Sequence, residues 1–276
     1  MKNSSLTFIL YFVCIVCTAE QTQAKNVFVD FGLSRHSFNY AQWSVAGNRL
    51  NDKDGQLKGG RVSVGYGPSS NSEFQFTYER INGTVEYDGL AQEGSALLTK
   101  TAENFKLFSL RFKRNLGITD SITHINWFAS AAVNHRNWDR HMQEKTADSS
   151  LRENYIWDEF DISLEAHYAI SDKNIVTSQA GSITGFNETL EVDINVMGAG
   201  KPKLQLGSVT GQYINLGYKR LVSTSSILDF VATYQYWHFD RSDDHLVDAG
   251  LRKLGLSEPE SKTHQAGVKI QFRMVF

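Results

Sequence analysis

The segment Gln265-Ala-Gly-Val-Lys-Ile-Gln-Phe-Arg-Met-Val-Phe276 alternates between two kinds of side chain. One face carries Ala266, Val268, Ile270, Phe272, Met274 and Phe276. The opposite face carries Gln265, Gly267, Lys269, Gln271, Arg273 and Val275. A period of two indicates a β-strand with one apolar and one polar face. A register shift of one residue would exchange the two faces, so the pairing of this strand is tightly specified.

The same alternation recurs along the chain. It is clear in residues 27–33, 62–66, 74–78, 108–112, 125–133, 156–168, 214–218 and 228–236. Residues 174–187 alternate weakly, and we expect a strand there mainly because an even count requires one. The sequence therefore predicts about ten strands, with apolar side chains on one face of the sheet and charged side chains on the other.

The connections between these strands alternate in length. Short turns are expected at residues 68–71, 117–121, 171–174 and 223–226, and long polar loops at residues 44–56, 88–103, 138–153, 188–208 and 241–261. This order predicts an up-and-down meander with both chain ends on the short-turn side. Aromatic residues near the strand ends are expected to form interfacial girdles, namely Tyr40, Trp43, Tyr87, Trp138, Tyr155, Trp237 and Phe276. Residues 246–256 have the spacing of a short surface helix.

The N-terminal residues have the order of an export signal. Lys2 is followed by an apolar run over residues 6–17 and by small residues at Ala19 and Ala24. We expect residues 1–24 to be a cleaved signal peptide and residues 25–276 to form one domain. Both cysteines, Cys14 and Cys17, lie in the expected signal, so the mature chain would form no disulfide and no thiolate metal site. The formal net charge of −2 gives no basic footprint for nucleic acid.

Alternation alone does not say which face points outward, and a soluble barrel or sandwich would turn its apolar face inward. Three features favour a membrane: charges of both signs on the opposite face, the asymmetric loop lengths and a final strand that ends in Phe276. The export signal and the strand of residues 265–276 together resemble the Gram-negative outer-membrane β-barrel proteins. This resemblance covers the whole chain as architecture and only its two ends as motif.

The resemblance implies an all-β fold, a transmembrane up-and-down antiparallel barrel of about ten strands located in the cell outer membrane. The implied partners are outer-membrane lipid and the barrel-assembly machinery, which reads the C-terminal strand ending in Phe276. Neither a cofactor nor nucleic acid is expected, and the oligomeric state stays open.

The inferred lumen gathers acids and bases. Its candidate lumen or pore residues are Arg111, Lys113, Arg136, Glu159, Asp161, Glu165, His167, Lys269 and Arg273. Unpaired charges in a narrow interior are costly, so these groups are expected to pair into a structural network. A polar path for small solutes is the alternative, although a barrel of this size has a modest bore.

Two polar segments are candidates for chemistry. Size and strand number are similar to the omptin surface proteases, and that resemblance implies an Asp-x-His pair and an acidic pair at the extracellular rim. Asp243 with His245, and Asp139 with His141, have the Asp-x-His spacing. Asp52 and Asp54 would be the acidic pair, although they fall in the first expected loop.

His135, Asp139 and His141 also have side chains that could ligate a metal. They fall in an expected polar loop beside an aromatic residue, which favours a solvated loop, and no metal site is expected.

Three hypotheses follow from the sequence. The first is a non-enzymatic structural or surface barrel, which could include a narrow pore. The second is a hydrolase with an Asp/His site at the extracellular rim. The third is a small-solute channel.

Overall fold

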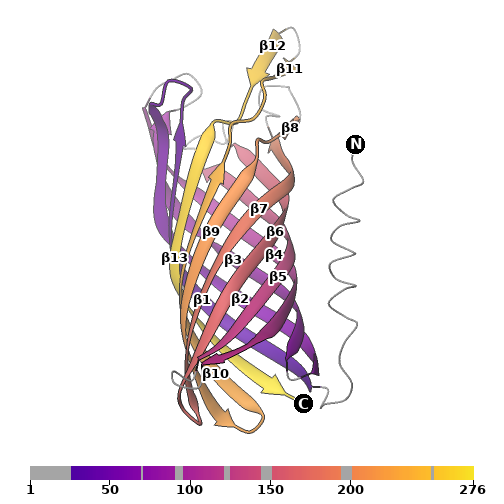
Figure 1. Ribbon diagram of the computed structural model, residues 1–276. Coiled ribbons are helices and arrows are strands. Elements are labelled where there is room, and N and C mark those ends of the chain that lie inside the picture. The colour runs from indigo at the N-terminus through magenta and orange to yellow at the C-terminus, as the bar shows by residue number, and fades with distance from the viewer. Residues whose placement is uncertain are drawn as a thin grey trace, which may run out of the picture.

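The computed structural model describes residues 26–69, 71–90, 96–120, 125–143, 151–193, 201–249 and 252–276. Within them, ten antiparallel strands close into a barrel (Figure 1). The barrel strands are β1 (Asn26–Trp43), β2 (Arg49–Ser69), β3 (Ser72–Leu90), β4 (Ala96–Asp120), β5 (Ile125–Gln143), β6 (Arg152–Ser171), β7 (Asn174–Asp193), β9 (Val209–Ser223), β10 (Ser226–Phe239) and β13 (Glu260–Val275). The described residues include no helix long and apolar enough to span a bilayer.

Closure is made by the first and last strands. β1 pairs with β2 on one side and with β13 on the other, where Phe31 lies opposite Phe272. The backbone amide of Phe276 donates to the carbonyl of Val27 at 2.8 Å. Every other barrel strand pairs with its neighbours along the chain, apart from short additions to the sheet. The predicted ten-stranded up-and-down barrel is confirmed, including β7, which has the weakest alternation.

The short turns lie at one end of the barrel. Ser171 pairs with Asn174, and Ser223 with Ser226, on either side of two of these turns. Asn26 pairs with Gly67 at the same end, where Figure 1 also places the C-terminus. The turn expected at residues 117–121 is wrong, because β4 continues to Asp120, which pairs with Ile125. The expected signal peptide lies outside the described residues.

The expected long loops are mostly strand. β2 begins at Arg49 and β3 runs to Leu90, and β5 extends to Gln143. At the end opposite the short turns, the strands continue well into the residues predicted as loops. The connections left between consecutive strands there are short. Residues 246–256, expected as a helix, instead belong to a hairpin of β11 (His245–Ala249) and β12 (Arg252–Leu256) that stands above the barrel (Figure 1). A short strand, β8 (Lys203–Gln205), adds to the upper end of β7.

The outer wall of the turn end is a continuous apolar belt. Leu33, Leu110 and Val268 expose 74%, 58% and 59% of their surface, although each is large and apolar. The belt comprises the outward side chains of residues 27–33, 62–66, 74–78, 108–112, 127–133, 160–168, 176–180, 214–218, 228–234 and 266–274. These segments are called the belt half. Such a band on the outer wall is typical of transmembrane barrels.

Above the belt most strands reverse their pattern, whereas the inward Ser261, Thr263 and Gln265 of β13 are polar. On β1 the outward residue after Leu33 is the exposed Arg35, whereas the inward Phe38 and Tyr40 are fully buried. On β6 Ile162 and Leu164 point outward, but farther up Trp157 is buried inside. The strand segments beyond the belt, which are polar outside and apolar inside, are called the rim half. They have the layout of a water-soluble barrel.

This reversal overturns the expected aromatic girdles. Tyr40, Tyr87, Trp138, Tyr155 and Trp237 are at most 4% exposed. They point inward because they lie above the belt, where the outer wall faces water and apolar rings are stabilised only inside. Among the expected girdle residues, Phe276 is 72% exposed.

One pair of substitutions on β9 tests the position of the belt. Leu216→Arg places a charge on the outer wall within the belt, and Gln212→Arg places the same charge on the outer wall above it. In lipid vesicles we expect Leu216→Arg to lower the free energy of unfolding by about 2–4 kcal/mol, because arginine is costly near the bilayer midplane. Gln212→Arg should change it little. Urea titration of the refolded barrel measures both, and equal losses would contradict this placement.

Candidate functional site

All nine residues predicted for the lumen lie on the inward face of the barrel. Their side chains come from β4, β5, β6 and β13, and those engaged in ion pairs are 28% exposed or less. Some ion pairs join strands two or three places apart around the wall, such as Arg111 with Asp161 and Lys269 with Glu79, whereas Arg136 with Glu159 and Arg273 with Asp30 join adjacent strands. The predicted lumen charges therefore pair with one another, most of them within the belt half, with Arg136 and Glu159 just above it.

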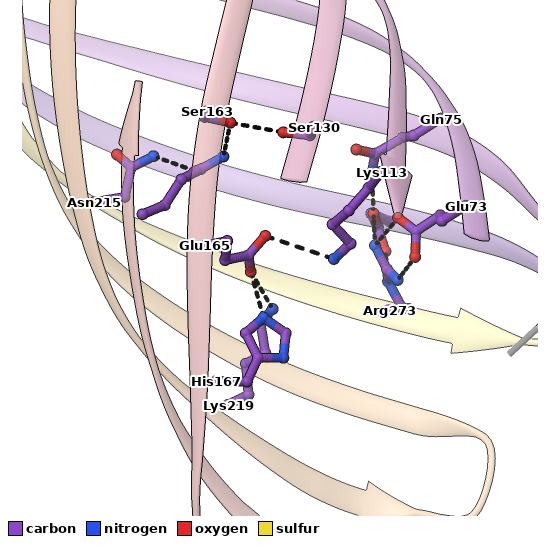
Figure 2. Close-up of polar contacts among 12 residues, drawn as sticks. Glu73, Gln75, Lys113, Ser130, Ser163, Glu165, His167, Asn215, Lys219 and Arg273 are labelled. Carbon is purple, nitrogen blue, oxygen red and sulfur yellow. Dashed lines mark hydrogen bonds and ion pairs between the residues drawn. The ribbon is translucent and has the colours of Figure 1, made fainter. Parts of the chain in front are cut away.

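Arg273 on β13 joins two carboxylates. Its guanidinium donates to Asp30 at 2.7 and 3.0 Å and to Glu73 at 3.0 and 3.4 Å. Figure 2 shows the fork reaching Glu73. The same guanidinium lies 3.8 Å from the ring centre of Phe28. Phe28 fits there because Gly65 has no side chain, since a Cβ at Gly65 would lie 1.8 Å from the ring.

Glu165 on β6 collects three bases. Its carboxylate lies 3.7 Å from Lys113 Nζ and 3.4 Å from Lys219 Nζ, and it also contacts His167 (Figure 2). The two lysine charges offset the desolvation of this carboxylate, and His167 adds a hydrogen-bond partner.

Further pairs complete the ring around a central cavity. Lys269 contacts Glu79 at 3.1 Å, and Arg111 contacts Asp161 at 3.3 Å. The cavity has a volume of about 200 Å³ and is lined mainly by these polar groups. Charges thus occupy the wall of the lumen and leave its centre open in the belt half.

Several cavity-lining atoms have no partner among the described residues. Both ring nitrogens of His36, Asp229 Oδ1 and Gln265 Nε2 are buried and face no donor or acceptor of the protein. Buried polar atoms of this kind are normally satisfied by water or a solute. The cavity is therefore suited to polar contents.

The rim half of the lumen is filled by an aromatic core. Its rings come from opposite sides of the barrel: Trp138 of β5 lies 5.3 Å from Tyr40 of β1 and 6.4 Å from Phe239 of β10. Phe105 and Tyr155 stack on the two faces of Trp138 at 4.9 and 4.8 Å. These contacts cross the lumen above the cavity. Tyr40, Trp138 and Tyr155 were predicted as girdle residues, and the core itself was not predicted from the sequence.

Two ion pairs are buried within the aromatic core. Lys53 and Glu103 are 0% and 1% exposed and meet at 3.4 Å, and Trp138 Nε1 donates to Glu103 at 2.6 Å. Burial and the nearby Arg140 lower the pKa of Lys53 to about 8. Arg140 pairs with Glu153, and its guanidinium lies about 5 Å from the rings of Tyr40, Trp138 and Tyr155. These cations are held by rings as well as by carboxylates.

Glu258, in the segment before β13, closes the upper surface of the aromatic core. Its carboxylate accepts hydrogen bonds from Gln42 Nε2 and Tyr155 Oη, both at 2.6 Å, and from Tyr40 Oη at 3.3 Å. Two further bonds join its backbone to Ser242. Burial, together with the charge of Glu153, raises the pKa of Glu258 above the ordinary value of 4.5. No motif in the sequence predicted that Glu258 would contact the aromatic core.

The structure does not bring the candidate catalytic residues together. Asp139 and His141 lie on the outer wall of β5 rather than in a loop, and Asp139 pairs with Arg152. Asp52 and Asp54 lie on the outer wall of β2, and two strands intervene between β2 and β5.

Asp243 is exposed beyond β10, and His245 begins β11. His135 pairs with Asp158 on the outer wall. Among the described residues, no group of three His, Cys, Asp or Glu side chains could hold a metal ion.

Comparison with known proteins gives a fold likeness. No family model and no curated protein matches the chain. The outer membrane protease OmpT of Escherichia coli aligns over 93% of this chain and 99% of its own, with 7% identity and a TM-score of 0.63. The NalP translocator domain of Neisseria meningitidis (9% identity, 96% and 94% covered, TM-score 0.41) and OprG of Pseudomonas aeruginosa (10%, 92% and 97%, 0.39) also align. The chain has the fold of the outer-membrane β-barrel proteins.

A double-mutant cycle on Lys269 and Glu79 tests the network. Lys269→Met leaves the 6%-exposed Glu79 without its ion-pair partner, so we expect a loss of about 3 kcal/mol in unfolding free energy. Combining it with Glu79→Leu should recover most of that loss, because no unpaired charge then remains. Urea titration in vesicles measures the cycle. A double variant less stable than Lys269→Met would contradict this expectation, because Glu79 would then stabilise the fold even without Lys269.

The pH dependence of stability tests Glu258. A carboxyl whose folded-state pKa is raised stabilises the fold fully below its unfolded pKa, and this contribution is lost as pH rises through the folded value. Between about pH 5 and 8 we expect the native barrel to lose at least about 1 kcal/mol relative to Glu258→Gln. Glu260→Gln, at a more exposed neighbour, is the control. Parallel pH profiles of native and Glu258→Gln barrels would refute this role.

Proposed function

We propose that this chain is an integral protein of the Gram-negative outer membrane. The apolar belt would lie in the bilayer, the turn end in the periplasm and the rim half outside the cell. Two observations support this placement: the belt encircles only the turn end, and short turns occupy the periplasmic end of outer-membrane barrels. Outer-membrane lipid and, through the strand that ends at Phe276, the barrel-assembly machinery are the proposed partners.

We further propose that the lumen is closed. The observation that carries this is the contact of Trp138 with rings from opposite walls, Tyr40 and Phe239, above the cavity. Glu258 covers the same aromatic rings on the side that faces away from the cavity. Solutes in the cavity would meet a packed core above it, and ions would have to cross apolar rings.

A closed lumen leaves the rim half as the working surface. It presents polar strands around an apolar core, and the β11–β12 hairpin stands above it (Figure 1). The function supported best is therefore a non-enzymatic surface protein, in which the belt anchors a rigid barrel that extends into the medium.

Conductance in a planar bilayer tests closure. We expect the refolded native chain to insert without steady ion flow, because the aromatic core blocks the path. Trp138→Ala combined with Phe239→Ala removes the rings that meet across the lumen and should produce measurable openings. Steady, ion-selective openings of the native chain would instead favour the small-solute channel.

The matched control is Phe76→Ala combined with Phe230→Ala, which removes two rings from the outer wall of the belt. It weakens the barrel by apolar loss without touching the lumen, so it should stay silent. Heat-modifiable gel mobility establishes that each variant is folded.

A rim hydrolase is the second candidate, because the fold likeness is to a protease. The separation of Asp139 and His141 from the acidic pair speaks against an omptin-like arrangement. The other Asp-x-His pair, Asp243 with His245, is tested by the variants Asp243→Asn and His245→Ala in a peptide-cleavage assay. Cleavage by the native chain that both variants abolish would favour the hydrolase, and absence of native cleavage would remove it.

A further inference from the structure

A row of four cations lies on the outer wall where the belt ends. Arg35 on β1, Lys58 on β2, Arg80 on β3 and Lys106 on β4 occupy adjacent strands. The first three are exposed and Lys106 is half-buried. On β1, β3 and β4 the cation is the next outward residue after the belt. We call these four residues the basic row.

The basic row sets like charges side by side. Arg35 lies directly opposite Lys58, and Arg80 directly opposite Lys106. Cross-strand neighbours have their Cβ atoms about 5 Å apart, and like charges at such positions destabilise a sheet. The protein keeps two such pairs on neighbouring hairpins, and an anion from outside the chain would relieve their repulsion.

The described residues do not neutralise the basic row. None of its four members forms an ion pair with a described residue. Arg35 Nε donates to the amide oxygen of Gln56 at 3.3 Å, and Arg80 Nε to that of Asn104 at 2.9 Å. The next outward carboxylate on β2, Asp54, lies four residues farther up, or about 13 Å along the strand.

On the other strands, the outward residues just above the belt do not form a row of cations. The outward residues above the belt are His135 and Asp158, which pair with each other on β5 and β6, and Gln212 on β9. On β10 and β13 they are Tyr236 and His264, whose rings contact each other. The positive charge is therefore confined to the face formed by β1 to β4.

We propose that the basic row binds the phosphate groups of a lipid in the outer leaflet. Directly below it, Leu33 and Phe108 offer an apolar wall for acyl chains. Anionic headgroups then lie at the height of the cations. A soluble anion or polymer would contact the cations of the basic row but not the apolar wall below them. Because the basic row and the apolar wall adjoin, a phosphorylated lipid is the better fit. This inference rests on the membrane placement of the proposed function and not on closure of the lumen.

The test measures binding of lipid A, a disaccharide lipid with two phosphates, to the refolded full chain in neutral-lipid bilayer discs. Lys58→Gln combined with Arg80→Gln should weaken binding about 30-fold, because each cation near an anionic lipid contributes about a fivefold factor. Native binding should also weaken as salt increases, and lipid A lacking phosphate should bind the native and variant chains equally.

The matched control is Lys173→Gln combined with Arg220→Gln. It removes one lysine and one arginine from exposed positions at the turn end, with the same change in net charge. Binding that survives in the control and falls in the basic-row variant supports the proposal. Equal binding by native and basic-row variant, or equal losses in both variants, overturns it. Heat-modifiable mobility of each variant separates loss of binding from loss of the inserted fold.

Discussion

The structure depends on one constraint: successive side chains on a β-strand point to opposite faces, and each strand passes between two different surroundings. A strand cannot rotate to suit both. Where the outer wall meets lipid, the outward residues must be apolar, and where it meets water the apolar residues must be on the inner face. The chain meets this by changing the parity of its apolar residues partway along, from Leu33 to Phe38 on β1 and from Ile162 to Trp157 on β6.

The two interiors follow from that change. In the belt half the inner face is polar by default, and charges such as Arg273 and Glu165 pair around the wall because single charges would be costly there. In the rim half the inner face inherits the apolar residues, and ten strands bring rings such as Trp138 and Phe239 into contact across the lumen. Cavity and seal are thus two results of one pattern. The basic row stands on the outside at the boundary between them.

Much of the fold could be predicted from the sequence, and the errors share one cause. Strand count and meander order follow from alternation, as in Val268 and Ile270, and the facing of the belt followed from the charges on the opposite face, the loop lengths and the final strand. Inward placement of the lumen charges followed from the same parity. Polar outward residues above the belt, such as Asp52 and Asp54, were predicted as loop because membrane strands were expected to end with the apolar residues.

The aromatic core was missed for the same reason. Its rings were assigned to membrane girdles because their parity was not compared with that of the belt, although Trp138 has the opposite parity to Val133 on the same strand. Glu258 is different. It enters the aromatic core through a tertiary contact between residues more than 200 positions apart, and no local pattern encodes that.

The most direct test of the central claim is a spin-label accessibility scan along β6. Residues 26–276 contain no cysteine, so single cysteines can be introduced in turn. Labels at Ile162 and Leu164 should collide with lipid-soluble oxygen, and labels at Asn154 and Asp158 with a water-soluble reagent. Labels at Tyr155 and Trp157 should be reached by neither. Water access at Tyr155 and Trp157, or oxygen access at Asn154 and Asp158, would contradict the reversal of the wall.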